Sequence, residues 1–168
     1  MKYTPKHSDI IMRTIYGGNI ACALVMMMLG TGLVRTILLS FSVVLLAVGL
    51  FLFIRHDLTS FTYIVMENEK RLDFYVDRAV GKRGAYACYY PLSDAVLIEK
   101  YEKGTKKRLY SEYGKVFVYN YCHNRFTKDK YIVMFRNDGY FDAVVIELDT
   151  GCYEYLKKGI EASKREQE

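Results

Sequence analysis

The residues of this chain best suited to chemistry are its four cysteines and three histidines. Thiolates and imidazoles are the ligands that zinc prefers, so a zinc site is the first possibility to consider, with Cys88, Cys122, His123 and Cys152 as its candidate ligands. These cysteines lack the Cys-x-x-Cys spacing that is typical of zinc sites. Cys122 and His123 are also adjacent at the end of an expected strand, where neighbouring side chains point to opposite faces. We therefore predict no metal site.

A cysteine activated by a histidine would be the second kind of chemistry. Cys122 and His123 are the only such neighbours in the sequence, but no residue near them is suited to orient the imidazole. Isolated cysteines in strands usually fill the core. His7 and His56 lie elsewhere, beside the apolar N-terminal region. The sequence thus predicts a protein that is not an enzyme and uses no cofactor.

Basic residues form the remaining candidate site, in two groups. Lys82 and Arg83 occupy an expected turn. The second group lies in an expected loop over 102–108 and consists of Lys103, Lys106, Lys107 and Arg108. Clusters of this kind contact either anionic lipid headgroups or a protein partner, and each basic side chain held at an anionic membrane contributes about 1 kcal/mol.

An alternative remains open for these groups, because Glu99 and Glu102 weaken the positive field around the second one. The basic residues would then only keep a loop solvated. Lys70 and Arg71 form a further basic pair, which we expect near the point where the chain leaves the membrane.

Two uncharged stretches, 14–34 and 36–54, would position these groups relative to a bilayer. Single arginines, Arg13, Arg35 and Arg55, bound them. About 20 apolar residues of helix cross the hydrocarbon core, so both stretches predict spanning helices that form a hairpin. The first run is too long for a cleaved signal peptide and is followed at once by a second. The rest of the chain is too short to bury such a hairpin in a soluble core.

The basic residues near the helix ends predict how the hairpin is oriented. Lys2, Lys6 and Arg13 precede it and Arg55 follows it, whereas the short connection around residues 30–35 carries one arginine. Lysine and arginine are retained on the cytoplasmic side. We therefore expect a multi-pass protein of the inner (cytoplasmic) membrane with both termini in the cytoplasm.

A patch of small and polar residues in the first helix indicates helix packing. It consists of Gly17, Gly18, Asn19, Ala21 and Cys22. Small residues four apart let helices approach closely, and an asparagine can hydrogen-bond across such a contact. Packing within the hairpin is one interpretation, and a contact between copies in a homo-oligomer is the other.

The rest of the chain is predicted to fold as one β-rich domain. Short runs rich in tyrosine, valine, isoleucine and phenylalanine predict seven strands, over 60–66, 71–76, 85–90, 95–101, 115–122, 131–135 and 140–148. Asp138-Gly139 marks a tight hairpin turn. A helix is expected to follow from Asp149 or Thr150. The predicted units are an arm (1–13), a transmembrane hairpin (14–55), the β-rich domain (56–162) and a charged tail (163–168).

The net charge of +5 belongs mostly to the membrane-flanking region, because the segment after Arg55 carries 19 basic and 18 acidic residues. No basic, aromatic RNA-reading motif is present, so nucleic acid is not an expected partner.

The order of these elements, with the segments 90–94 (Tyr-Pro-Leu-Ser-Asp) and 144–155, resembles the pleckstrin-homology-like domains of small bacterial membrane proteins. The chain has no tryptophan, unlike the closing helix of eukaryotic pleckstrin-homology domains. The resemblance implies an α+β protein with a seven-stranded antiparallel sandwich or barrel closed by a C-terminal helix. We expect a membrane-anchored interaction module that binds a protein partner or docks on anionic lipid. The alternative is a structural subunit that assembles through its transmembrane helices.

Overall fold

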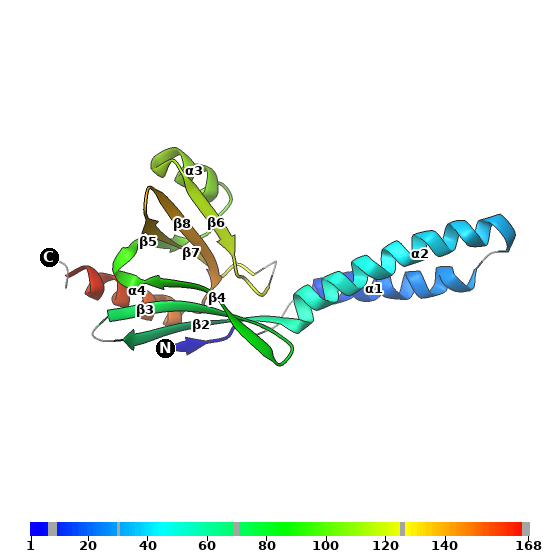
Figure 1. Cartoon of the computed structure of the whole chain (residues 1–168), viewed down its shortest axis with the longest axis horizontal. Coiled ribbons are helices and arrows are strands. Elements are labelled where there is room, and N and C mark those ends of the chain that lie inside the picture. The colour runs from blue at the N-terminus through cyan, green and yellow to red at the C-terminus, as the bar shows by residue number, and fades with distance from the viewer. Residues whose placement is uncertain (7–9, 30, 69–70, 125–126, 166–168) are drawn as a thin grey trace.

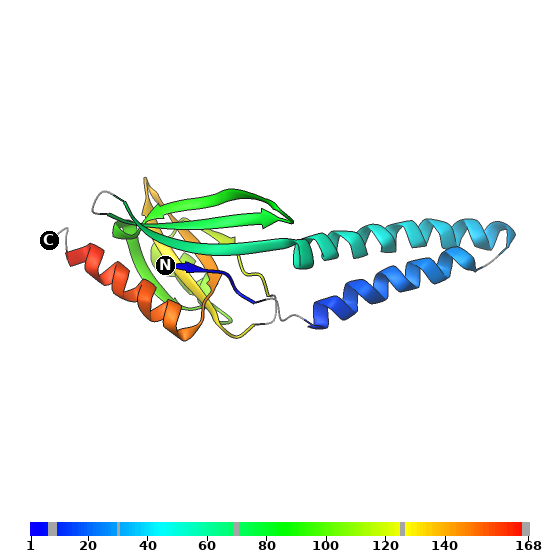
Figure 2. The same cartoon turned by 90° about the horizontal axis from the view of Figure 1, so that it is seen from below.

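The computed structural model describes residues 1–6, 10–29, 31–68, 71–124 and 127–165 (Figure 1). The molecule is elongated, because a helical hairpin projects from one end of a β-rich domain (Figures 1 and 2). The helices of the hairpin are α1 (Ile10–Met28) and α2 (Gly32–Phe53), and α2 continues into the short π-helix η1 (Ile54–Leu58).

The hairpin helices are long and apolar enough to cross a membrane, as predicted. Only 17% and 11% of their most apolar windows are buried, whereas the core helix of a soluble protein is mostly buried. Their ends differ from the prediction. Arg13 lies within α1, and Arg35 lies in the first turn of α2 rather than in the connection. Arginine is a good helix former, so a single charge does not end a helix.

The N-terminal arm contains a strand that the sequence did not indicate. This strand, β1 (Lys2–Tyr3), pairs antiparallel with β2 (Thr59–Asn68), with Tyr3 opposite Tyr63. Thr4 and Thr62 share a hydrogen bond of 2.8 Å between their hydroxyls. The residues before α1 and those after α2 are therefore joined in one sheet.

The domain contains two four-stranded sheets. In the first sheet, β1 and β2 are followed by β3 (Arg71–Val80) and β4 (Arg83–Pro91). The second sheet has the order β5 (Ala95–Lys100), β7 (Lys130–Asn137), β8 (Tyr140–Glu147) and β6 (Val116–Asn120). Each of the seven predicted strands corresponds to one of β2 to β8. The Asp138-Gly139 turn is confirmed, with Gly139 at a φ of 75°.

The prediction of wholly antiparallel sheets and of a seven-stranded sandwich or barrel is corrected in three respects. The two sheets do not form a closed barrel, and β1 adds an eighth strand to the described fold. The segment expected to be a lysine-rich loop contains helix α3 (Thr105–Tyr113). This helix connects β5 to β6, which are the two edge strands of the second sheet and run in the same direction, so β6 is parallel to β8.

Two cores stabilise the domain, one on each face of the second sheet. The larger core lies between the two sheets and α4 (Thr150–Arg165), and it includes Phe74, Phe135 and Leu156. The smaller core lies under α3, where Leu109 packs with Ile132. Alternate residues of β7 enter the two cores, as the period of a strand requires.

The C-terminal helix follows the prediction at its start and differs at its end. Asp149 caps α4, accepting a 2.7 Å hydrogen bond from the backbone N–H of Cys152. Ser163, expected to begin a frayed tail, is buried within α4. Residues 166–168 of the predicted tail lie outside the described residues.

Candidate membrane-facing site

The turn between β3 and β4 lies beside the end of the hairpin. The backbone N–H of Gly81 donates a 2.9 Å hydrogen bond to the carbonyl of Leu58, the last residue of η1. Val80 pairs with Thr59, the next residue along the chain. This pairing places Lys82 and Arg83 next to the point where the chain leaves α2, and both side chains are exposed.

An aromatic surface adjoins this turn on β4, which is an edge strand of the first sheet. Tyr86 and Tyr89 are 70% and 47% exposed, and their ring centroids lie 5.8 and 5.0 Å from that of Tyr75. A groove of about 620 Å³ continues from the turn and is lined by Arg78, Arg83, Tyr86 and Tyr121 among others. Cationic and aromatic groups thus occur together at the end of the domain nearest the hairpin.

The second basic group occupies a different place. Helix α3 lies over the second sheet, on the side away from the first sheet, and does not adjoin the hairpin (Figure 1). Arg108 forms ion pairs with Glu99 and Glu112, and the hydrogen bond that it donates to the Glu99 carboxylate raises the pKa of the Arg108 guanidinium. Nζ of Lys106 lies over the ring of Tyr110, 5.6 Å from its centre. Lys103 and Lys107 are exposed, Lys103 just before the helix and Lys107 on it.

The expectation that Lys70 and Arg71 lie near the membrane exit is wrong for Arg71. Arg71 pairs with Asn68, at the end of the ten-residue strand β2 that is farthest from η1. At about 3.3 Å per residue, this is about 30 Å from Thr59. Lys70 lies outside the described residues.

The small residues of α1 do not make the close contact within the hairpin. A Cβ atom added at Gly17 or Gly18 would meet nothing within 4 Å, and Ala21 and Cys22 are exposed. The Asn19 amide donates to the carbonyl of Ile15 in its own helix, at 3.0 Å.

The helices approach closely at Gly49 of α2, a residue that the sequence analysis missed. A Cβ atom there would lie 2.8 Å from Cγ1 of Ile20, 3.4 Å from the carbonyl oxygen of Tyr16 and 3.5 Å from Cβ of Asn19, so Asn19 of the predicted patch does lie at this contact. The available signal was a single glycine within the otherwise bulky sequence from Val43 to Phe53.

Polar contacts fix the open end of the hairpin. Asp57 of η1 accepts hydrogen bonds from the Tyr16 hydroxyl and, at 3.2 Å, from Nε of Arg13. The guanidinium of Arg55 lies 5.2 Å from the centre of the Phe61 ring. The hairpin and the first sheet are thus joined by side chains as well as by β1.

A pocket of about 360 Å³, called here the junction pocket, lies between α2, η1 and the loop after β6. Its walls include Phe51, Leu52, Arg55, His56, His123 and Lys130, with Cys122, Asn120 and Asn124. Strand β6 ends at Asn120, so Cys122 and His123 lie beyond the strand and both line the pocket. The expectation that they point to opposite faces applied only if the strand continued through them, and β6 ends before them.

The chemistry first considered for these residues is not assembled here. Cys88 and Cys152 do not line the junction pocket, and within the described ranges no three histidine, cysteine or acidic residues form a group that could hold a metal ion. Burial raises the pKa of the Cys122 thiol to about 12, which keeps it protonated, whereas a nucleophilic cysteine needs a lowered pKa.

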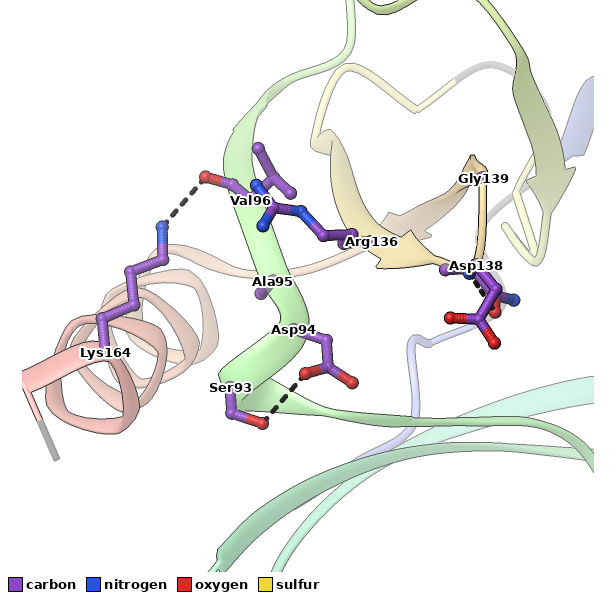
Figure 3. Close-up of a pocket in the computed structure, with 9 residues that line it drawn as sticks. Ser93, Asp94, Ala95, Val96, Arg136, Asp138, Gly139 and Lys164 are labelled. Atoms are coloured by element: carbon purple, nitrogen blue, oxygen red, sulfur yellow. Dashed lines mark hydrogen bonds between the residues drawn. The ribbon is translucent and has the colours of Figure 1, made fainter. Parts of the chain in front are cut away.

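A third pocket, of about 690 Å³, lies beside the turn between β7 and β8 (Figure 3). Arg136, Asp94 and Asp138 line it together with Lys164 of α4. Lys164 donates a 3.0 Å hydrogen bond to the carbonyl of Val96, so this lysine fastens α4 to β5. The pocket is open and mixed in charge, and it does not favour one class of ligand.

Comparisons with known proteins give no match for this chain, whether with family models, curated proteins or solved structures. No relative therefore supports the expected resemblance to pleckstrin-homology-like domains. The described geometry supports the coarser conclusion, which is a pair of helices able to cross a membrane followed by a domain of two sheets and a closing helix.

Proposed function

We propose that the protein is a membrane-anchored interaction module, with no enzymatic role, whose β-rich domain docks on anionic lipid headgroups through the β3–β4 turn. The observation that carries the proposal is the hydrogen bond between Gly81 and Leu58. This bond holds Lys82 and Arg83 beside the end of η1, which connects α2 to the β-rich domain. A protein partner would then bind the parts of the domain that remain in solution.

The level of the turn along the hairpin supports this docking. Leu58 lies five residues beyond the end of α2, which is about 7 Å along a helix axis. The headgroup layer on each side of the hydrocarbon core is about 5 to 8 Å thick. If the core ends near Phe53, Lys82 and Arg83 lie at headgroup level, whereas α3 lies farther from the hairpin.

The same proposal places both ends of the hairpin on the cytoplasmic side of the inner membrane. Pairing of β1 with β2 supports a common side for the two ends, because one strand precedes α1 and the other follows α2. The open end of the hairpin carries two arginines, Arg13 and Arg55, whereas the closed end carries one, Arg35. This excess of positive charge favours the cytoplasmic side for the open end.

We also propose that the domain is a divergent bacterial pleckstrin-homology-like domain. Its two sheets closed by α4 are consistent with that class, as is the short helix Leu92–Asp94 that follows Pro91 and leads into β5. The parallel pairing of β6 with β8 is a departure from the expected antiparallel order.

Lysine footprinting of the full chain in nanodiscs tests the docking. An amine-reactive reagent is applied in anionic phosphatidylglycerol and in zwitterionic phosphatidylcholine, and modification is quantified by mass spectrometry. We expect Lys82 to react several-fold more slowly in the anionic nanodiscs, while Lys106 and Lys107 serve as internal controls with unchanged rates. Equal reactivity of Lys82 in both lipids, or protection of the α3 lysines instead, would refute the proposal.

A second candidate function, a structural subunit assembling through the membrane helices, is favoured by the open space at Gly17 and Gly18. Leucine at Gly18 fits the hairpin but would obstruct a second copy packed on that face of α1. Gly18→Leu should therefore reduce the particle size in detergent, measured by light scattering. An unchanged size would count against this candidate. Gly49→Leu is the matched contrast, because it clashes within the hairpin itself.

A further inference from the structure

The junction pocket has walls of two kinds, which meet where the chain leaves the hairpin. Phe51 and Leu52 belong to the apolar helix that could span a membrane, and Phe51 is 68% exposed. Arg55 follows them on the same continuous helix, and Lys130 at the start of β7 brings a second cationic side chain to the lining. An apolar wall continuous with a membrane-spanning surface, with basic side chains beside it, suits a ligand that is itself amphiphilic and anionic.

The two cations come from separate parts of the chain, and both line the junction pocket. Arg55 is on η1 and is held over the ring of Phe61, whereas Lys130 begins β7. Cys122 lines the same pocket, and both cations act to lower the pKa of its buried thiol, although burial outweighs them.

A buried carboxylate lies opposite Lys130 in the β7–β8 pairing, and Asn124 binds it. Glu147 accepts hydrogen bonds from the side-chain amide of Asn124 at 2.6 Å and from its backbone N–H at 3.0 Å. These bonds and Lys130 lower the pKa of the Glu147 carboxyl, although burial raises it by more. No aspartate or glutamate lines the junction pocket among the described residues, so its lining is positive.

We propose that the junction pocket binds the phosphate of one anionic phospholipid, with Arg55 and Lys130 on the phosphate and the acyl chains along Phe51 and Leu52. Basic pockets at the cytoplasmic ends of membrane helices are suited to such headgroups. A volume of about 360 Å³ accommodates a headgroup but not a whole lipid. This inference rests on the proposed membrane placement and adds a discrete site to the general docking by the turn.

Native mass spectrometry of the full chain in detergent tests the site. The protein is supplied with phosphatidylglycerol, with diacylglycerol, which lacks the phosphate, or with inorganic phosphate. We expect one retained phosphatidylglycerol per chain and no retained diacylglycerol. Charge-assisted hydrogen bonds are worth about 1.5 to 3 kcal/mol, so Arg55→Gln or Lys130→Gln should reduce retention roughly tenfold or more. Lys128→Gln, an exposed neighbour, should leave it unchanged.

Three results would overturn the proposal. They are retention of diacylglycerol equal to that of phosphatidylglycerol, retention that does not depend on Arg55 and Lys130, and thermal stabilisation by inorganic phosphate without any retained lipid, which would indicate a site for a free anion. If the glutamine variants unfold, the wild-type chain still decides the matter, because phosphatidylglycerol should raise its melting temperature and diacylglycerol should not.

The footprinting of Lys82 and the lipid-retention experiment test the two proposals separately. A retained phosphatidylglycerol with an unprotected Lys82 would remove the docking by the turn and leave the junction site. A protected Lys82 without a retained lipid would remove the junction site and leave the docking by the turn.

Discussion

The β3–β4 turn and helix α3 carry similar basic residues in the sequence but are held in opposite ways. The turn is fixed to the end of the hairpin through Gly81 and Leu58, and its two cations are exposed. Helix α3 is fixed to the second sheet through Leu109, and Arg108 is paired with acidic side chains of the domain. The difference teaches that segments with similar basic sequences are held in different places, and it is the reason why we propose lipid docking for the turn and not for α3.

The largest expected effect concerns the anchor of α3. Leu109 is fully buried, so Leu109→Ala should lower the free energy of unfolding by about 2 to 5 kcal/mol. Denaturant unfolding of the full chain in detergent, followed by near-ultraviolet circular dichroism of its tyrosines, measures this loss. Tyr110→Ala is the control, because Tyr110 is 41% exposed. Equal losses in the two variants would mean that α3 is not held over the second sheet.

A matched removal of two charges from each segment should give the next largest effect. Lys82→Gln with Arg83→Gln should weaken docking on anionic nanodiscs by about 2 kcal/mol, since each charge contributes about 1 kcal/mol. Lys106→Gln with Lys107→Gln should change it little.

Energy transfer to a dansyl-labelled lipid measures this docking. The chain has no tryptophan, so Tyr86→Trp introduces a single donor beside the turn. If both double variants reduce the transfer equally, the two segments do not differ in their contact with lipid.

The geometry of the turn supplies a smaller effect. Gly81 has a φ of +62°, a conformation that costs a residue with a Cβ about 1 to 2 kcal/mol. Gly81→Ala should therefore destabilise the domain by that amount in denaturant unfolding. Gly84→Ala is the control, because Gly84 lies at the start of β4 beside the turn, has no positive φ, and an added Cβ would meet the Ala79 Cβ at an ordinary 3.8 Å. An equal loss at Gly84 would show that the conformation of Gly81 does not hold the turn.

The sequence anticipated those elements whose signal is local. The apolar runs of α1 and α2 predicted helices able to cross a membrane, and short apolar-aromatic runs separated by turn signals located β2 to β8. Helix α3 was missed because its sequence is rich in lysine and carries only Leu109 and Thr105 as buried residues. Strand β1 was missed because two residues form no pattern, and their pairing with Tyr63 and Ile64 is a long-range contact.

The candidate site shows the same limit. The sequence analysis treated Lys82, Arg83 and the basic residues of α3 as equal candidates for contact with lipid or a partner. Composition does not show how far apart two basic groups lie in the folded chain. The junction pocket joins Arg55 with Cys122 and Lys130, which lie more than 60 residues later in the chain. The sequence considered Cys122 and His123 only as metal ligands or a nucleophile, because their place in one pocket depends on the packing of the loop after β6 against the hairpin.

The smallest expected effect concerns the ion pairs of Arg108. Its guanidinium is exposed, and salt screens exposed pairs because the Debye length falls to about 3 Å at 1 M. Arg108→Gln should therefore lower the melting temperature slightly at low salt and not at all in 1 M sodium chloride. Lys82→Gln should change it under neither condition, because Lys82 forms no ion pair with the described residues. A salt-dependent loss at Lys82 would mean that the turn, like α3, directs its charge toward the domain rather than toward lipid.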